Sequence, residues 1–373
     1  MSSHWLADRA RSFDASGVRK VFDLGAKLKN PINFSIGQPD FDVPEPARRA
    51  AVDAIESRKN GYAVTQGVPV LRDKLQSQID GEYGHADRQV FVTSGTSGGL
   101  VLALMMTVNP GDEVIVFDPC FMMYDALTSV VGGRLVRVDT YPDFRIDLNR
   151  AADAITPRTK AILFNSPANP TGAVADEATV RGLARLAAER DVLLISDEVY
   201  RMYCYDRPFV SPAKFNPQTL VLDGFSKSYG MTGWRLGFAH GPAAIIHEMI
   251  KLQQYTFVCA PQPFQWAGAA AMEVDMSAQA AEYHRKRDVL LAGLADDYEI
   301  AKPGGAFYMF PKTPWGADEE FVTRAIEKYQ LLIIPGSVFG GHNTHFRISY
   351  AVDDATLERG IEALRKLAKN RGL

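Results

Sequence analysis

Two cations lie close together in the stretch GFSKSYGMTGWRLGF, residues 224–238. Lys227 and Arg235 follow the apolar run TLVL, residues 219–222, which has the composition of a buried strand. A partly desolvated lysine amine can act as a nucleophile. An arginine guanidinium suits a phosphate or a carboxylate, because its fork of donors matches two oxygens. The stretch therefore predicts a ligand site that combines amine chemistry with the binding of an anion.

The elements that must position these cations form a regular series. Short apolar runs are each followed by a small or polar loop or a helical pattern, at residues 89–93, 113–117, 161–165, 192–196 and 219–222. Apolar strands that alternate with helices favour an α/β fold whose parallel sheet is covered on both faces. Ligands of such sheets bind outside the carboxyl ends of the strands. The residues just after these runs are therefore predicted to form one site.

The residues that follow the runs fit the parts of a single ligand. The loop SGTSGG, residues 94–99, opens a helix and offers backbone N–H groups for a phosphate, which Arg235 and the nearby Ser226 could complete. An aspartate that ends a buried strand, as Asp197 does, needs a cation or a donor. A phosphate, a protonated ring nitrogen for Asp197, an aldehyde for Lys227 and a flat ring for Phe121 together describe pyridoxal 5'-phosphate (PLP).

Each of these residues also has a purely structural explanation. Asp197 could cap a helix at residues 197–200, and Asn169 lies in NPTG, a good turn former. Arg235 and Arg347 could be structural ion-pair partners, and an aromatic after a strand, such as Phe121, is usually core. It is the combination of residue types after the strands that favours the ligand roles.

The chain resembles the class I/II (aspartate/aromatic-type) aminotransferases, which are fold-type I PLP-dependent enzymes, over nearly its full length. The motifs that carry the resemblance are, in order, SIGQPDF, Tyr62 with GVP (67–69), SGTSGG, NSPANPTG, SDEVY, SKSYGMTGWRLG, PGSVFG and FRISYA. The fold implied is α/β, with a large PLP-binding domain over residues 45–284 built on a mostly parallel seven-stranded sheet flanked by helices. Residues 1–44 and 285–373 are expected to form an N-terminal arm and a smaller α+β domain, with the site between the two domains.

The resemblance implies a role for each matching residue. Lys227 would hold PLP as a Schiff base and then carry protons, while Asp197 would pair with the pyridine nitrogen. The remaining cofactor contacts implied are Tyr200 and Asn169 on the ring oxygen, Phe121 on the ring face, and Ser94, Gly95, Thr96, Ser226 and Arg235 on the phosphate. Arg347 would bind the substrate α-carboxylate together with Asn169 and the backbone of Gly37. Tyr62 would reach the phosphate of a neighbouring subunit, which implies a homodimer.

The activity implied is a ping-pong transfer of an amino group between an L-amino acid and a 2-oxo acid. A β-eliminating C–S lyase or a ring-forming synthase of the same fold would use the same residues and stays open. A PLP-binding regulatory domain is disfavoured, because there is neither room nor basic charge for a DNA-binding module. A dinucleotide-binding oxidoreductase is disfavoured because no G-x-G-x-x-G follows the first strand.

The sequence departs from family patterns at two positions. Gly224 stands where many members have a serine, and Ser97 stands where some aspartate-type members have a lysine. The second departure argues against a strict preference for dicarboxylates.

Composition limits the kinds of molecule that the protein is expected to bind. A formal net charge of -3 argues against a nucleic-acid footprint and against an electrostatic membrane partner. No uncharged apolar run approaches the ~20 residues that span a bilayer, and the polar N-terminus does not resemble a signal peptide, so a cytoplasmic protein is expected. The three cysteines are isolated, and His342 and His345 lie in a glycine-rich segment without a carboxylate at ligand spacing. No metal site is therefore predicted.

Overall fold

The computed structural model describes residues 3–11, 13, 21, 25 and 28–370, and its larger part is built on a seven-stranded sheet. The strand order is β2-β8-β7-β6-β5-β3-β4, and only β8 runs antiparallel to its neighbours. The strands are β2 (Arg88–Thr93), β3 (Glu113–Asp118), β4 (Arg134–Asp139), β5 (Thr159–Asn165), β6 (Leu193–Asp197), β7 (Leu220–Gly224) and β8 (Gly237–Pro242). The five apolar runs are confirmed as strands, whereas β4 and β8 lie outside them.

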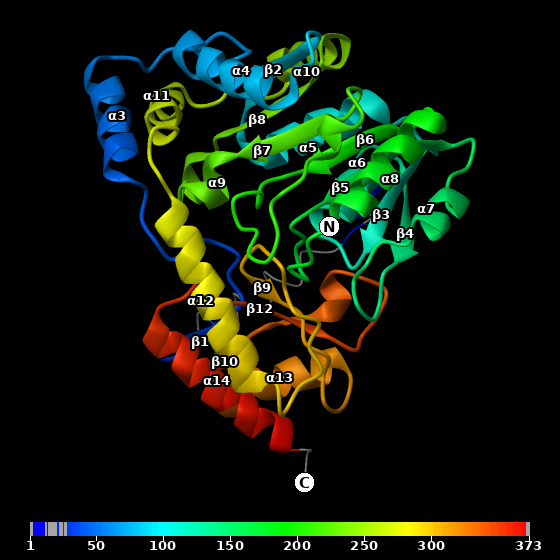
Figure 1. The fold of residues 1–373 in the computed structure, drawn as a ribbon, viewed down its shortest axis with the longest axis vertical. Helices are drawn as coiled ribbons and strands as arrows, with labels where there is room; N and C mark the ends of the chain where they lie inside the picture. Colours follow the sequence, from blue (N-terminus) through cyan, green and yellow to red (C-terminus); the bar gives the residue numbers. More distant parts are fainter. Residues whose placement is uncertain (1–2, 12, 14–20, 22–24, 26–27, 371–373) are drawn as a thin grey trace.

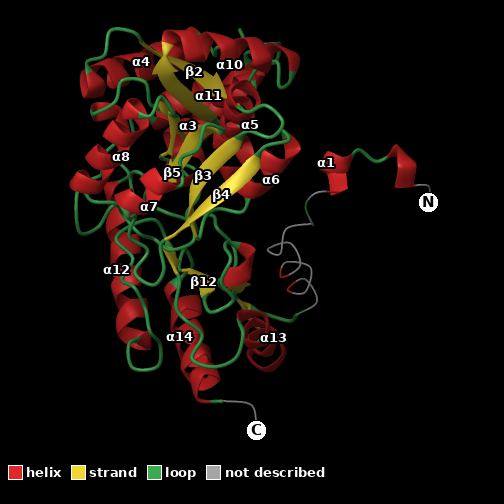
Figure 2. Cartoon of the chain, turned by 90° about the vertical axis from the view of Figure 1, so that its right-hand side faces the viewer, coloured by secondary structure: helices red, strands yellow, loops and turns green. Residues whose placement is uncertain are grey.

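Both faces of this sheet are covered by helices, as Figure 2 shows. In β3, Val114 and Val116 face one hydrophobic cluster while Ile115 faces another, since successive side chains of a strand point to opposite faces. The helices of the first face are α5 (Gly95–Thr107), α6 (Met123–Val130) and α10 (Ala243–Tyr255), and those of the second are α7 (Leu148–Asp153) and α8 (Glu177–Glu189). A third cluster at the β2 side draws on α3 (Glu45–Glu56), α4 (Pro69–Tyr83) and α11 (Gln262–Ala271).

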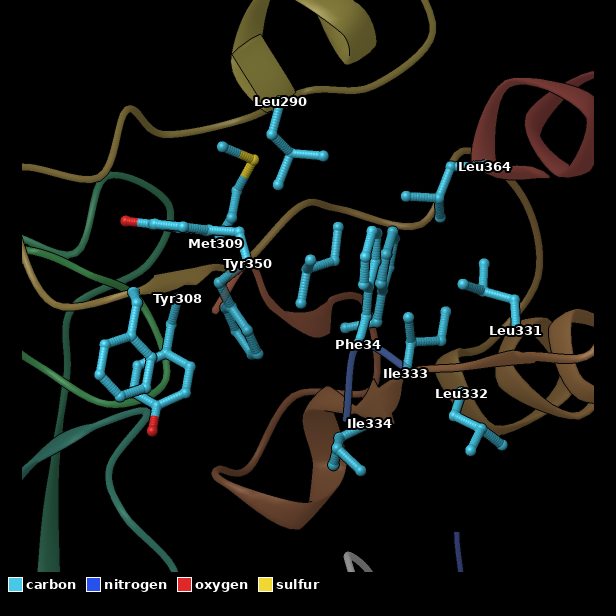
Figure 3. Close-up of a cluster of buried hydrophobic side chains, with 14 of the residues drawn as sticks. Phe34, Leu290, Tyr308, Met309, Leu331, Leu332, Ile333, Ile334, Tyr350 and Leu364 are labelled. Carbon is cyan, nitrogen blue, oxygen red and sulfur yellow. The ribbon is translucent and has the colours of Figure 1, made fainter. Parts of the chain in front are cut away.

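The smaller part joins segments from both ends of the chain (Figure 1). β1 (Ile32–Asn33) pairs in parallel with β10 (Leu331–Leu332), while β11 (Ile334–Pro335), β12 (Phe346–Ser349) and β9 (Tyr308–Met309) form an antiparallel sheet. Helices α12 (Ser277–Leu294), α13 (Asp318–Tyr329) and α14 (Asp354–Lys369) complete it. Its core brings Phe34 together with Ile333 and Leu364 (Figure 3). The predicted α+β unit from both chain ends is thus confirmed.

The predicted domain boundaries at 44/45 and 284/285 stay a prediction. The second boundary falls inside α12, a continuous helix that extends from beside the large sheet into the smaller part (Figure 1). Several residues of the 1–44 segment lie outside the described part of the chain.

The expected helix at residues 197–200 is wrong. Asp197 ends β6, and Val199 and Tyr200 lie in a turn, so Asp197 caps no helix; its carboxylate accepts instead from the Val199 amide. Lys227 lies in the four-residue helix α9 (Phe225–Ser228), which begins directly after β7. The short elements not yet named are α1 (Asp8–Arg11) and the 3-10 helices η1 (Ser3–Trp5), η2 (Pro212–Lys214), η3 (Thr232–Trp234) and η4 (Gly336–Val338). Within the described residues, no helix is long and apolar enough to cross a bilayer.

Candidate active site

A cavity of about 240 Å³ lies at the carboxyl ends of the central strands, next to the smaller part. Ten residues singled out from the sequence line it: Gly37, Thr96, Phe121, Asn169, Asp197, Tyr200, Ser226, Lys227, Arg235 and Arg347. Ser94 and Gly95 immediately precede Thr96 at the start of α5. Most of this lining comes from the segments that follow β2, β3, β5, β6 and β7, because these strands run parallel and end at one edge.

Lys227 projects from α9 into this cavity. Its Nζ donates to the Gly37 carbonyl oxygen at 2.5 Å. Burial, together with the charges of Arg347 and Arg235, lowers the pKa of this amine to about 8. With this pKa roughly a tenth of the amine is unprotonated at pH 7, and the unprotonated form is the one that attacks an aldehyde or accepts a proton.

Asp197 is the last residue of β6 and is only 4% exposed. Its Oδ2 accepts from the Tyr124 hydroxyl at 2.7 Å and its Oδ1 from the Val199 amide at 3.3 Å. Burial raises the pKa of this carboxyl to about 6, although both hydrogen bonds and the Lys227 charge favour its ionised form. A buried carboxylate of this kind suits a cationic ring nitrogen, whose charge would favour ionisation.

Arg235 lies against the N-terminus of α5 and lines the same cavity. Its backbone is left-handed, with φ of 54°. A Cβ on Gly95 would come within 2.5 Å of Arg235 Nη2, so only glycine lets the guanidinium lie this close. Ser94, at the N-cap, makes no side-chain cap, which leaves the first amides of α5 available. A cation beside free helix N-terminal amides is a phosphate site by its chemistry.

Arg347 comes from β12 of the smaller part and is buried, with 3% exposed. It donates to the Asn169 side-chain oxygen at 3.0 Å and to the Ser35 carbonyl at 2.7 Å, both of them uncharged. Its Nε has no hydrogen-bond partner among the described residues. The guanidinium also lies over the rings of Tyr308 and Phe339. Burial lowers its pKa. A buried cation with an unused donor calls for an anion.

The sequence missed three residues of this site. Tyr124 bonds to Asp197, and Asn165 donates from Nδ2 to the Asp197 carbonyl at 2.9 Å. Tyr308 shares a 2.8 Å hydrogen bond with the Tyr200 hydroxyl. Asn165 ends the apolar run at 161–165, so the strand-end rule could have found it. No local signal marked Tyr124 or Tyr308, because they reach the site by helix placement and by the packing of the smaller part.

Two other predicted residues, Phe121 and Tyr62, lie differently relative to the cavity. Phe121 lines the cavity and stands edge-on to Tyr124, with ring centroids 5.7 Å apart. Tyr62 lies outside the cavity of its own chain and is 87% exposed.

His342 and His345 both pack against the ring of Tyr141. Among the described residues, no group of three or more His, Cys, Asp or Glu could hold a metal ion.

The family model for aminotransferase class I and II matches residues 29–364. The chain belongs to this family. A probable aspartate aminotransferase of Methanocaldococcus jannaschii is 34% identical to it, over 97% of this chain and 99% of the relative. Aromatic-amino-acid aminotransferase 2 of Thermococcus litoralis is 33% identical, over 99% of both chains. The solved aspartate aminotransferase of Thermus thermophilus with maleate superposes with a TM-score of 0.92 at 34% identity, covering 97% of this chain and 99% of that one.

For this aminotransferase, the predicted family, fold class and transfer activity are therefore confirmed. The family is PLP-dependent, and its members act on amino acids and 2-oxo acids and usually form dimers. The residues present fit such a cofactor, since one cavity holds a buried carboxylate, a half-buried amine and a cation at a glycine-lined helix terminus.

Proposed function

We propose that this aminotransferase binds PLP through Lys227 and transfers the amino group of a monocarboxylic amino acid to a 2-oxo acid. The observation that carries the proposal is the composition of the 240 Å³ cavity, which gathers three cations around one buried carboxylate. The cations differ in position and partners, so each suits a different part of the cofactor and substrate. PLP, when bound, would supply an aldehyde carbon for the amine and a protonated ring that withdraws electrons from the substrate.

The phosphate would lie at the start of α5. Thr96, Ser226 and Arg235 line the cavity, and Ser94 and Gly95 directly precede Thr96 at the start of α5, so their amides would be the further donors. Gly224 directly precedes α9 and offers no hydroxyl, so the phosphate would depend more on Arg235 and on the helix terminus.

Phe121 would hold the face of the ring, and Asp197 would hold its nitrogen. Tyr200 and Asn169 would donate to the ring oxygen. Asn169 Oδ1 is already used by Arg347, which leaves its Nδ2 for a ligand. Asp197 keeps its role only as a carboxylate, because the ionised form accepts the hydrogen bond from a ring N–H⁺.

Lys227 is the proton carrier of the proposal. After the substrate amine has replaced it, its Nζ would remove the proton from the substrate α-carbon and return a proton to the cofactor carbon. A pKa near 8 leaves this amine able to do both near neutral pH. Arg347 would hold the substrate carboxylate, and its buried surroundings would exclude water from that contact.

The substrate side chain is proposed to be uncharged. With Lys227, Arg235 and Arg347 assigned, no further cation lines the cavity within the described residues, and Ser97 adds only a hydroxyl. Leu100, Phe121 and Met122 line the same cavity. We therefore expect apolar or aromatic amino acids as donors, although one relative is named a probable aspartate aminotransferase and another an aromatic-amino-acid aminotransferase.

A homodimer is proposed because large apolar side chains are exposed in two segments of the single chain, namely Tyr62, Val64, Tyr255, Phe257 and Val258. The segment that carries Tyr62 is held firmly: buried Gln253 donates to the Thr65 carbonyl, and the Val68 amide donates to Gln265. Tyr62 would thereby be held outward, toward the phosphate of a partner chain.

The purified protein provides the test. We expect a visible absorbance band that disappears on treatment with borohydride, which should leave the reduced cofactor attached to Lys227. Lys227→Ala should lack the band. Incubation with single amino acids should convert the cofactor stoichiometrically to its amine form, most readily with apolar or aromatic donors. Catalytic release of pyruvate and ammonia would instead indicate the β-eliminating lyase, and a band retained in Lys227→Ala would overturn the proposal.

A further inference from the structure

Tyr124 connects two residues of the site without lying in any motif that pointed to it. It is the second residue of α6 and is 1% exposed. Its hydroxyl donates to Asp197 Oδ2 at 2.7 Å, and its ring stands at 89° to that of Phe121. A phenylalanine would fill the same apolar surroundings, so packing alone does not explain the hydroxyl.

We propose that Tyr124 is a positioning residue of this aminotransferase, which holds the Asp197 carboxylate toward the ring nitrogen and Phe121 against the ring face. The inference rests on the proposed binding of PLP, because only then do Asp197 and Phe121 face one ring. Tyr124 itself acts through these two neighbours.

The hydrogen bonds around Asp197 support the orienting role. Asn165 donates to the Asp197 backbone carbonyl, whereas the Asp197 carboxylate has two hydrogen-bond partners among the described residues, the Tyr124 hydroxyl at 2.7 Å and the Val199 amide at 3.3 Å. The torsion that turns an aspartate carboxylate is broad and roughly two-fold. Without the Tyr124 hydroxyl, the carboxylate would keep one long hydrogen bond and would turn more freely.

The charges around Asp197 give the hydroxyl a second effect. The titratable groups that interact with the Asp197 charge are Tyr124 on α6, Lys227 on α9, Tyr200 in the following turn and Asp223 on β7. Burial raises the pKa of Asp197 to about 6, while Tyr124, Val199 and Lys227 lower it. The pKa of Tyr124 is itself raised by burial and by Asp197, so the phenol stays protonated and donates. Removing it therefore raises the pKa of Asp197 further.

The test measures binding of pyridoxamine 5'-phosphate to the cofactor-free protein by calorimetry between pH 5 and 9. This probe has the ring nitrogen and the phosphate but no aldehyde, so the titration of Lys227 as a nucleophile does not enter. Binding should weaken as Asp197 gains a proton. In Tyr124→Phe, the pH at which affinity begins to fall should move upward by about one unit, with affinity about tenfold lower below it and nearly unchanged at pH 9.

Two comparisons separate positioning from a general structural effect. Tyr298→Phe is the matched control, because Tyr298 is also a buried tyrosine whose hydroxyl donates at 2.7 Å, to the Leu364 carbonyl far from the cavity. It should leave the pH profile unchanged. In an Asp197→Asn background, Tyr124→Phe should have no further effect on the pH profile, because the group it acts on has lost its ionisation.

The outcomes are distinct. Equal weakening by Tyr124→Phe at every pH, or the same loss in the Asp197→Asn background, would overturn the inference. A Tyr124→Phe protein that does not fold, as judged by circular dichroism beside Tyr298→Phe, would assign Tyr124 a structural role and also overturn it. Failure of the unaltered protein to bind the probe would instead contradict the proposed function, so the two failures are distinguishable.

Discussion

The two arginines of the cavity are held in opposite ways. Arg235 belongs to the larger part, is exposed in the single chain and lies at the N-terminus of α5, where a left-handed backbone and Gly95 set its position. Arg347 belongs to the smaller part, is buried, and is held by two uncharged oxygens and two aromatic rings. The first cation is placed by local backbone geometry and the second by tertiary packing.

This difference predicts that the two arginines interact with a bound anion to different extents. A solvated guanidinium keeps much of its hydration, so its attraction to an anion is moderated by water. A buried guanidinium without an acid partner has lost its hydration, so an arriving carboxylate is both its counter-ion and its missing hydrogen-bond acceptor. We therefore expect Arg347 to affect turnover more than Arg235 does.

The largest effect is expected for Arg347→Leu. Loss of a buried charge–carboxylate contact should reduce kcat/KM by about 1,000-fold, roughly 4 kcal/mol, while the affinity for PLP changes little. Arg347→Lys keeps the charge but loses the bidentate fork and should give an intermediate loss. Steady-state kinetics at saturating PLP measure both variants. A fall in PLP affinity equal to the fall in kcat/KM would contradict the assignment of Arg347 to the substrate.

A smaller effect, on a different quantity, is expected for Arg235→Met. The dissociation constant of PLP should rise about 30-fold, roughly 2 kcal/mol, because hydrogen bonds to a charged phosphate are lost. At saturating PLP, the KM for the amino donor should stay close to that of the unaltered enzyme. Equilibrium dialysis measures the first quantity and kinetics the second. Unchanged PLP affinity would remove Arg235 from the phosphate site.

Gly95→Ala tests the local geometry behind Arg235. The new Cβ would meet Arg235 Nη2 at 2.5 Å and would force the guanidinium away, so PLP affinity should fall about tenfold. Gly84→Ala is the matched control, since Gly84 has a similar φ of 65° but nothing within 4 Å of its Cβ. Both should lose about 1–2 kcal/mol of unfolding free energy from the left-handed backbone. Equal PLP affinity in the two variants would contradict this account of the cradle.

The smallest effect concerns Lys227. Burial lowers its pKa to about 8, and Arg347 and then Arg235 contribute through their charges. A lowered amine pKa makes the neutral nucleophile available at lower pH, so removal of either charge should move the PLP-capture rate profile to higher pH. The shift should be larger for Arg347→Leu than for Arg235→Met. The rate at which cofactor-free protein captures PLP, followed by absorbance from pH 6 to 10, measures it. A larger shift in Arg235→Met would reverse the comparison.

Much of the site could be predicted because its residues follow strands. Asp197 ends β6, and Ser94–Thr96 follow β2, so a rule about parallel sheets placed them at one edge. The apolar run before Lys227 likewise placed the amine there, although not its helix α9. The strands β4 and β8 were missed: β4 is only partly buried, and β8 contains glycine, histidine and proline, so neither forms a continuous apolar run.

The sequence by itself determined the α/β order of elements and the residue types gathered at the sheet edge, because these depend on local hydrophobic patterns and on which residue follows each strand. Only the tertiary structure decided that Tyr124 bonds to Asp197, that Tyr308 pairs with Tyr200, and that Arg347 lies buried with no carboxylate partner among the described residues. In the sequence, Tyr124 and Asp197 are 73 positions apart, Tyr200 and Tyr308 are 108 apart, and Asn169 and Arg347 are 178 apart. No local pattern records such separations, since they follow from how the two parts of the chain pack together.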